Sequence, residues 1–227
     1  MKVGAFKEIC GLMSACGLID EFHTDENKHF IGYDSGKTFV ADLEYDNDLP
    51  AGTNIINVKG MMQTFNLFAD DVEVVLADGR LKINDGDVTA SMVLSASEPT
   101  KINIPKLDVT DYDIVINNVE RKTLNSVSRL RPEAIINEYY FLFVENGKLM
   151  IRIGDADGSH VGRKIADVVD GDKADSSKVA KYTMNVSECF KNIKTNATIK
   201  IISDKIMSVC SKTETYTVTY HIAPRAD

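Results

Sequence analysis

Alternating hydrophobic and polar positions dominate the chain and predict a protein built mostly from β-strands. Strands are expected at 39–45, 72–76, 139–144 and 215–222, which are rich in β-branched and aromatic residues. Between such segments lie the dipeptides Ser35-Gly36, Asp78-Gly79, Asp85-Gly86 and Asn146-Gly147. Asp-Gly and Asn-Gly readily adopt the positive φ angles that two-residue hairpins require. The pattern therefore favours antiparallel meanders over a parallel sheet.

Four segments break this alternation with the 3.6-residue period of amphipathic helices. Helices are expected at about 2–16, 57–68, 118–131 and 185–194. In the second of these, Val58, Met61 and Phe65 share one side and Lys59 lies on the other. Pro132 should end the third helix, because proline cannot continue a helix.

The second and fourth expected helices match position for position at an offset of 128 residues, which indicates an internal duplication. Both begin with Asn-Val, and Asn is a favourable N-cap. We therefore expect an α+β protein with an N-terminal domain 1–98, a connector 99–110 and a C-terminal domain 111–227. The Asp- and Gly-rich segment 154–178 is expected to be a long loop that interrupts the second half.

The chain is acidic as a whole, yet its expected helices are positively charged. The 227 residues include 26 Lys and Arg and 34 Asp and Glu, a net charge of −8. The helices contain nine of these cations and three of these acids, so they carry +6 and the remainder carries −14. The cations are Lys2, Lys7, Lys59, Arg121, Lys122, Arg129, Arg131, Lys191 and Lys194.

Two interpretations of these cationic helices compete. A single solvated helix face often carries Lys or Arg for solubility alone. Four helices that agree in sign instead favour contact with a polyanion of evenly spaced charge, such as duplex DNA. Lys and Arg at phosphates position a protein without reading sequence. We therefore take these nine residues as candidate DNA-facing residues.

The order of the elements resembles that of the DNA sliding clamps. The resemblance is carried by the segments 57–62, 78–83 and 123–129 and by the tail Tyr220-His221-Ile222-Ala223-Pro224. It is greatest to the two-domain clamps of T-even-type bacteriophages and extends to the proliferating cell nuclear antigen family. The resemblance implies the two-domain clamp fold, with four β-α-β-β-β repeats, helices that line the channel of a ring, and antiparallel sheets outside.

The same resemblance implies a processivity factor. Clamps of this size close as homotrimeric rings around double-stranded DNA, a clamp-loader ATPase opens them, and the replicative DNA polymerase is tethered to them. Partners would dock a short hydrophobic peptide beneath the connector, beside the C-terminal tail. This partner-peptide pocket maps to Ile102, Ile104, Leu107, His221, Ala223 and Pro224. Ordinary packing explains the three connector residues equally well, and it explains His221 better.

Other functions find less support. No nucleophile–base–orienter set emerges, and the four histidines lack metal-ligand spacing, so we expect no enzymatic activity, no cofactor and no metal. No stretch approaches the ~20 apolar residues that span a bilayer. We expect no membrane association and a cytoplasmic location, in the host cytoplasm for a viral protein.

Two rival classes remain. The main one is a β-rich viral structural protein of a capsid or tail, which would not need cationic helix faces repeated at a fixed offset. The second is a single-strand binder of the OB type. An aromatic content of 7% without tryptophan makes stacking platforms scarce for that class.

Overall fold

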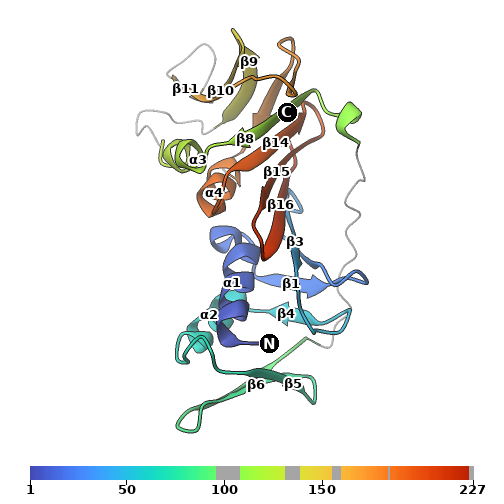
Figure 1. Ribbon diagram of the computed structural model, residues 1–227, viewed down its shortest axis with the longest axis vertical. Coiled ribbons are helices and arrows are strands. Elements are labelled where there is room, and N and C mark those ends of the chain that lie inside the picture. Colours follow the sequence, from blue (N-terminus) through green and yellow to red (C-terminus); the bar gives the residue numbers. More distant parts are fainter. Residues whose placement is uncertain (96–107, 131–138, 155–159, 184, 225–227) are drawn as a thin grey trace. The chain divides into compact units, whose positions relative to one another are not determined.

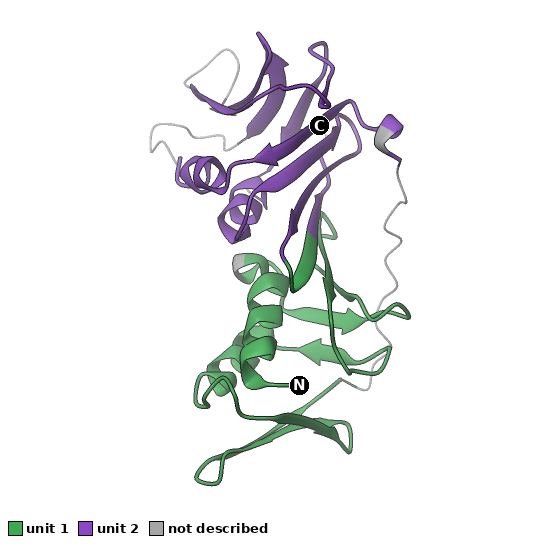
Figure 2. Cartoon of the chain, viewed as in Figure 1, with its two compact units in different colours: residues 1–103, 214–218 green, residues 104–213, 219–227 purple. Residues whose placement is uncertain are grey.

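The chain divides into two compact units, coloured separately in Figure 2. The computed structural model describes residues 1–95, 108–130, 139–154, 160–183 and 185–224. Unit 1 is Met1–Asn103 with Glu214–Val218, and unit 2 is Ile104–Thr213 with Thr219–Asp227. Each unit combines two helices with antiparallel sheets (Figure 1), which confirms the expected α+β class.

Unit 1 contains two helices and seven strands within the described residues. The helices are α1 (Val3–Met13) and α2 (Val58–Phe65). The strands are β1 (Glu21–Thr24), β2 (Phe30–Tyr33), β3 (Phe39–Tyr45), β4 (Asn54–Ile56), β5 (Val74–Ala77), β6 (Arg80–Asn84) and β7 (Thr89–Val93). One run of paired strands has the order β4-β1-β2-β3, and a separate sheet has the order β5-β6-β7.

Unit 2 repeats this plan with longer strands. Its helices are α3 (Arg121–Val127) and α4 (Asn185–Asn192). Its strands are β8 (Ile114–Val119), β9 (Tyr140–Glu145), β10 (Lys148–Gly154), β11 (His160–Asp167), β12 (Lys173–Ala174), β13 (Val179–Tyr182), β14 (Ala197–Ile202), β15 (Ile206–Lys212) and β16 (Tyr216–Ile222), whose first residues belong to unit 1. The orders are β13-β9-β10-β11 and β12-β8-β14-β15-β16.

The two units share one topology, in agreement with the internal duplication expected from the sequence. The run β4-β1-β2-β3 corresponds to β13-β9-β10-β11. The sheet β5-β6-β7 corresponds to β14-β15-β16. In unit 2, β8 pairs with β14, and in unit 1 the corresponding contact is the single bridge between Lys2 and Glu73. Four β-α-β-β-β repeats result, and the first strand of the first repeat is reduced to that single bridge.

The helices pack through the apolar stripes that the sequence predicts. Phe6 of α1 and Phe65 of α2 are both fully buried, and their ring centroids lie 5.4 Å apart. The Asn57 side chain accepts a hydrogen bond from the Gly60 N–H at 3.0 Å and so caps α2. Such a cap stabilises a helix by about 1 kcal/mol.

Two hairpin turns have the backbone conformation that the sequence predicts. Asp78 and Gly79, between β5 and β6, have φ angles of 55° and 67°. Asn146 and Gly147, between β9 and β10, have φ angles of 49° and 69°. Positive φ at both central residues defines the type I′ turn, whose twist matches the flanking strands. The local sequence therefore favours the observed register of the strands that meet at both turns.

The helices are shorter than the sequence pattern suggests, and α3 differs most. The chain up to Val119 belongs to β8, which pairs with β14, and α3 begins only at Arg121. Ser128 is its C-cap, so Arg129 lies beyond the helix end. Strand pairing between distant segments cannot be read from a local helical period.

No helix within the described ranges is long and apolar enough to cross a membrane.

The expectation of a long loop at 154–178 is wrong. This segment contains β11, which pairs with β10 along its length, and the short strand β12, which pairs with β8. Among the residues of β11, Ile165 alone is buried, at 3% exposure. An edge strand with one buried side chain lacks the alternation by which a strand is recognised. The neighbouring strand, rather than the local sequence, determines its conformation.

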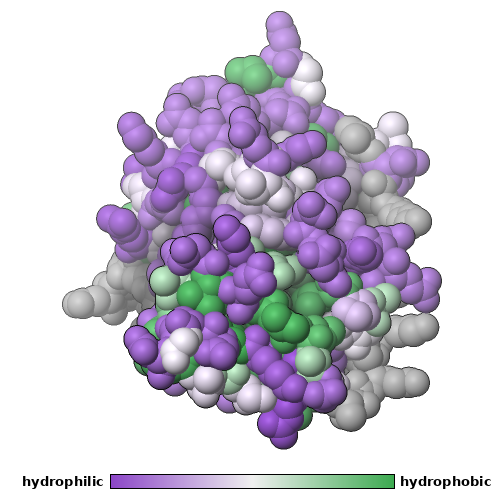
Figure 3. Space-filling model, turned by 60° about the horizontal axis from the view of Figure 1, so that its bottom comes forward, coloured by the Kyte–Doolittle hydropathy of each residue, from purple (hydrophilic) through white to green (hydrophobic). Residues whose placement is uncertain are grey.

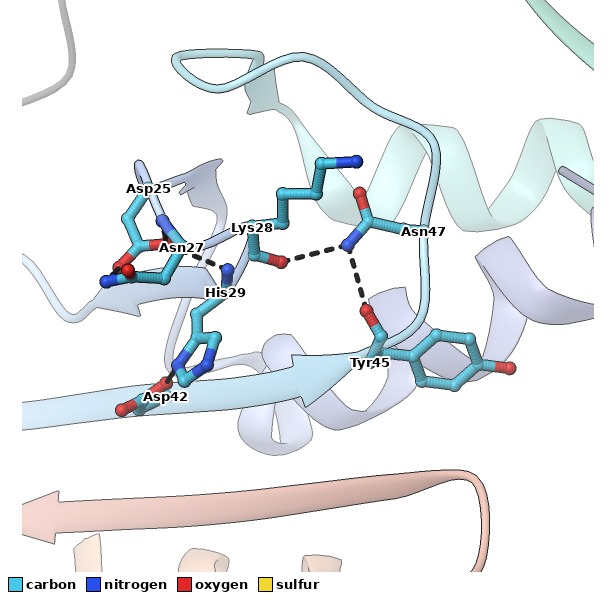
Figure 4. A network of polar contacts seen from close by, with 7 residues as sticks. All are labelled: Asp25, Asn27, Lys28, His29, Asp42, Tyr45 and Asn47. Atoms are coloured by element: carbon cyan, nitrogen blue, oxygen red, sulfur yellow. Dashed lines mark hydrogen bonds and ion pairs between the residues drawn. The ribbon is translucent and has the colours of Figure 1, made fainter.

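Polar contacts organise the chain around β2 in unit 1 (Figure 4). One carboxylate oxygen of Asp25 accepts the backbone N–H of Asn27 and that of His29, both at 2.8 Å. The His29 ring lies 3.1 Å from the carboxylate of Asp42 on β3. The Asn47 side chain donates to two backbone carbonyls at 2.9 Å. These contacts hold the turn before β2 and the segment after β3 in place.

Candidate nucleic-acid interface

Three exposed cations of unit 2 lie on α3 or just after its C-terminal end. Val127 and Leu124 turn inward and are fully buried, which leaves Arg121, Lys122 and Arg129 exposed. None of these three cations forms an ion pair with another residue in the part of the chain that the structure describes. Their charges are therefore available to an external anion.

Side-chain amides fix the start of α3. The Asn196 carbonyl oxygen accepts the Arg121 N–H at 3.2 Å, and the Asn196 NH₂ group donates to the Asn118 side chain at 2.8 Å. Asn118 itself has a φ of 53°, a left-handed conformation that Asn tolerates well. Asn196, which directly precedes β14, therefore holds the N-terminus of α3 in place. It lies 75 positions from Arg121 and 78 positions from Asn118 of β8.

Two surface hollows border this face. One has a volume of about 570 Å³ and is lined by Glu120, Arg121, Lys122, Asn125 and Asn196. The other has a volume of about 450 Å³ and is lined by Lys122, Asn125, Ser126, Arg129, Leu130 and Arg163. Cations and neutral hydrogen-bond donors on a concave surface suit phosphate oxygens, and the second hollow contains no acidic residue, whereas Glu120 lines the first.

Arg163 is a member of this cationic group that sequence reasoning missed. It lies on β11, is exposed, and reaches the second hollow beside Lys122 and Arg129. It falls within the segment expected to be a loop and follows no helical period. Only the pairing of β11 with β10 and the contact of β11 with α3 bring it to this place.

The cations of the other helices have different surroundings. Lys191 on α4 is exposed and lies 3.4 Å from the Glu188 carboxylate, and Lys194 is exposed just beyond the helix. Lys59 on α2 and Lys2 at the N-cap of α1 are also exposed. Arg131 lies outside the described residues.

Lys7 is a structural residue as much as a surface cation. Its Nζ lies 2.6 Å from the Asp70 carboxylate and donates to the Phe68 carbonyl at 3.1 Å. Its side chain is 23% exposed. The lysine therefore ties α1 to the chain that follows α2, and Asp70 offsets its charge.

The partner-peptide pocket is described only in part. Ile102, Ile104 and Leu107 lie outside the described residues. Ala223 and Pro224 follow β16 and are half-buried. His221 on β16 lies 2.9 Å from the Ser208 hydroxyl. Burial, with a further contribution from the Lys200 charge, lowers the pKa of His221 to about 4. His221 is therefore an uncharged, packed strand residue at neutral pH.

Solved structures resemble the chain over its full length. Proliferating cell nuclear antigen from Entamoeba histolytica has a TM-score of 0.73 at 12% identity, covering 100% of this chain and 97% of that one. The antigen from A. fulgidus, bound to the C-terminal region of FEN-1, has a TM-score of 0.69 at 15% identity, covering 100% and 97%. The chain has the sliding-clamp fold.

A bacterial sliding clamp is similar as well. DNA polymerase III subunit beta from Borrelia burgdorferi has a TM-score of 0.74 at 15% identity, covering 100% of this chain and 63% of that chain. No protein-family model and no curated protein matches the sequence. At such identities the similarity establishes the sliding-clamp fold alone, so the expected kinship with T-even-type bacteriophage clamps stays a prediction.

Proposed function

We propose that this protein is a DNA sliding clamp, a closed ring that encircles duplex DNA and tethers the replicative DNA polymerase to make it processive. The observation that carries the proposal is the correspondence of the whole chain to clamp structures in both units. The chain acts as a scaffold without chemistry of its own, in the cytoplasm.

The distribution of charge supports this function. The α3 cations, Lys59, Lys191 and Lys194 would face the DNA and contact phosphates only. Contacts of this kind carry no sequence information, so the ring slides. The acidic remainder of the chain would repel DNA from the outer surface. A ring held on DNA by its topology needs only weak contacts.

The internal duplication supports a way in which the ring would close. Within unit 1, the first residues of β16 lie beside β3, and the rings of Tyr45 and Tyr216 stack at 6.5 Å. By the duplication, β11 corresponds to β3 and β7 corresponds to β16. We therefore expect β11 of one subunit to pair with β7 of the next. Three subunits of two units each would then close the ring and leave no open sheet edge.

The surface of unit 1 around β7 suits such a contact. Val93 on β7 is 57% exposed, Val75 on β5 is 52% exposed, and Val88 just before β7 is 40% exposed. Figure 3 turns the β5–β6 end toward the viewer and shows hydrophobic side chains gathered into a patch. Exposed apolar area beside an unpaired strand edge is typical of a surface that a partner covers.

Partners are proposed by analogy with the neighbours. The A. fulgidus structure contains a C-terminal region of FEN-1, so a clamp of this fold binds the end of another protein. For this chain the corresponding partners are a DNA polymerase tail and a clamp-loader ATPase. The pocket of Ile102, Ile104, Leu107, His221, Ala223 and Pro224 would bind a hydrophobic peptide.

Retention on circular DNA tests the proposed function. Protein loaded on a nicked circle should stay bound for at least tenfold longer than on the same DNA after linearisation, because a ring slides off free ends. Gel filtration of the complexes with and without the cutting enzyme measures the difference. Equal retention on both forms would contradict the clamp and favour a structural protein.

Changing Ile104 to Asp tests the partner pocket. A buried carboxylate is costly in an apolar pocket, so binding of a polymerase tail peptide should weaken at least tenfold. Calorimetry measures the affinity, and Leu67→Asp, at a residue that is 67% exposed in unit 1, is the matched control. Unchanged affinity for the Ile104 variant would remove this residue from the pocket.

A further inference from the structure

One face of the sheet β13-β9-β10-β11 carries aromatic rings and cations together. Burial alternates along β9, β10 and β13, so every second side chain points away from the core of unit 2. These outward side chains are Phe141, Phe143, Met150, Arg152, Val179 and Lys181. Val179 is 51% exposed and the others are half-buried. This face therefore combines apolar side chains with two cations and is partly accessible to solvent.

The cations of this face lie over the rings. The Arg152 guanidinium carbon is 4.9 Å from the Phe141 ring centroid and 5.7 Å from that of Phe143. The Lys181 Nζ is 4.8 Å from the Tyr139 ring centroid. In the sheet register, Phe141 is paired with Arg152 on one side and Lys181 on the other. Adjacent strands are about 4.8 Å apart, so the backbones that carry the two cations are roughly 10 Å apart, on either side of β9.

The row of the sheet that holds Phe141 is positively charged. It contains Lys181 and Arg152 and no acidic residue. The row through Phe143 contains Lys164, but the Asp167 carboxylate lies 2.7 Å from the Lys164 amine and offsets its charge. The next row on this face contains Glu145, Lys148 and Asp167. In a chain of net charge −8, the local excess of positive charge therefore lies around Phe141.

Arg152 is half-buried over two aromatic rings and keeps one donor without a partner in the part of the chain that the structure describes. Its Nε is buried and has no hydrogen-bond partner among the described residues. A buried donor without a partner costs free energy, so its presence calls for an explanation. The guanidinium plane is held over two rings, a position in which it can stack under a base while its terminal N–H groups reach phosphate oxygens.

The geometry points to a binding surface for single-stranded nucleic acid on this outward face. Arg152 and Lys181 bind phosphates, and bases stack on the guanidinium plane of Arg152 and the neighbouring rings. An acidic polypeptide matches the charge but makes no use of the flat platform. Although aromatic residues make up 7% of the chain, the sheet places three of them in alternate positions around a single strand.

This surface is separate from the proposed duplex channel. It uses none of the helix cations, so a single-strand contact and a duplex contact can be removed one at a time. A clamp with both would hold duplex in the ring and single-stranded nucleic acid on its sheet. Binding of a single strand and retention on a duplex circle are separate measurements, so either proposal can fail while the other stands.

Fluorescence anisotropy with a labelled oligo(dT) tests the surface at low salt. The double variant Arg152→Glu with Lys181→Glu should bind about tenfold more weakly or worse, and its dependence of log K on log salt should flatten by ~0.7 per lost phosphate contact. Phe141→Leu keeps an apolar side chain but removes the ring, and should weaken binding about fivefold. Lys82→Glu with Lys205→Glu makes the same change in net charge at positions outside this sheet; it is the matched control and should bind as the unchanged protein does.

Competition and folding controls make the outcomes decisive. Each variant is checked by thermal melting, and each is loaded on nicked circular duplex, where its retention should be unchanged. Oligo(dT) binding that persists in the Arg152/Lys181 variant, or that is lost equally in an Arg121→Glu, Arg129→Glu variant, overturns the assignment. A polyglutamate peptide that displaces oligo(dT) at equal concentration, with Phe141→Leu unaffected, also overturns it, because the occupant is then an acidic polypeptide.

Discussion

Reversing the charges of Arg121 and Arg129 together should shorten retention on nicked circular DNA by at least tenfold. The two side chains are exposed on one face, and both border hollows lined by Lys122 and Asn125. Charge reversal would remove the two proposed phosphate contacts and add two repulsive charges. Each lost contact should also reduce the slope of log K against log salt by ~0.9 for duplex DNA. The salt dependence of retention measures this directly.

A matched control separates this local effect from net charge. Lys148→Glu with Lys205→Glu makes the same change in net charge at exposed positions of unit 2 away from α3. This control should be retained as the unchanged protein is. Thermal melting should show both double variants folded, because none of the four residues belongs to the core. Equal retention of the two double variants would show that α3 does not face the DNA.

Replacing Ser91 with proline should prevent the proposed trimer from forming and leave a monomer. The Leu94 N–H donates to the Gly79 carbonyl across the β6–β7 hairpin at 3.1 Å. N–H groups of successive residues in a strand point to opposite edges, so the Ser91 N–H, three residues before Leu94, faces the open edge of β7. Proline removes that donor and places its ring where a neighbouring strand would pair. Edge strands tolerate proline on their solvent side, so the subunit itself should fold.

Light scattering or native mass spectrometry reads the outcome of this change. Ser91→Val keeps the backbone N–H and favours a strand, so it should remain trimeric and serves as the control. The Ser91→Pro change should also abolish the difference between circular and linear DNA, since an open subunit cannot encircle a duplex. A trimer that survives this substitution, in a protein shown to be folded, would rule out pairing through β7.

Short-range features of the fold could be predicted from the sequence because their causes are local. The stripe of Val58, Met61 and Phe65 repeats at the helical period, and Asn57 supplies its own cap. Asp78-Gly79 adopts the type I′ conformation because of the residues it contains. The offset of 128 residues between α2 and α4 revealed the duplication that the topology repeats.

Features that depend on contacts between distant segments could not be predicted. Arg163 joins the α3 cations only because β11 pairs with β10, and β11 has a single buried residue to mark it as a strand. Lys7 looked like a free surface cation, but Asp70, 63 positions away, lies 2.6 Å from its amine. The helical period predicts which face of a helix a residue occupies. It cannot predict which charged residue of a distant segment will lie beside it.

The sequence by itself determined where the helices lie, the hairpin turns and the duplication. These follow from side-chain period, capping and φ preference, which act within a few residues. Within the observed bounds only α2 and α3 carry a net positive charge, because Glu8 offsets Lys7 in α1 and Glu188 offsets Lys191 in α4. Only the tertiary structure decided which strands form edges, which cations stand together around α3, and which rings share a face with Arg152. Strand pairing decides these features, because the register of two paired strands places residues side by side whatever their separation along the chain.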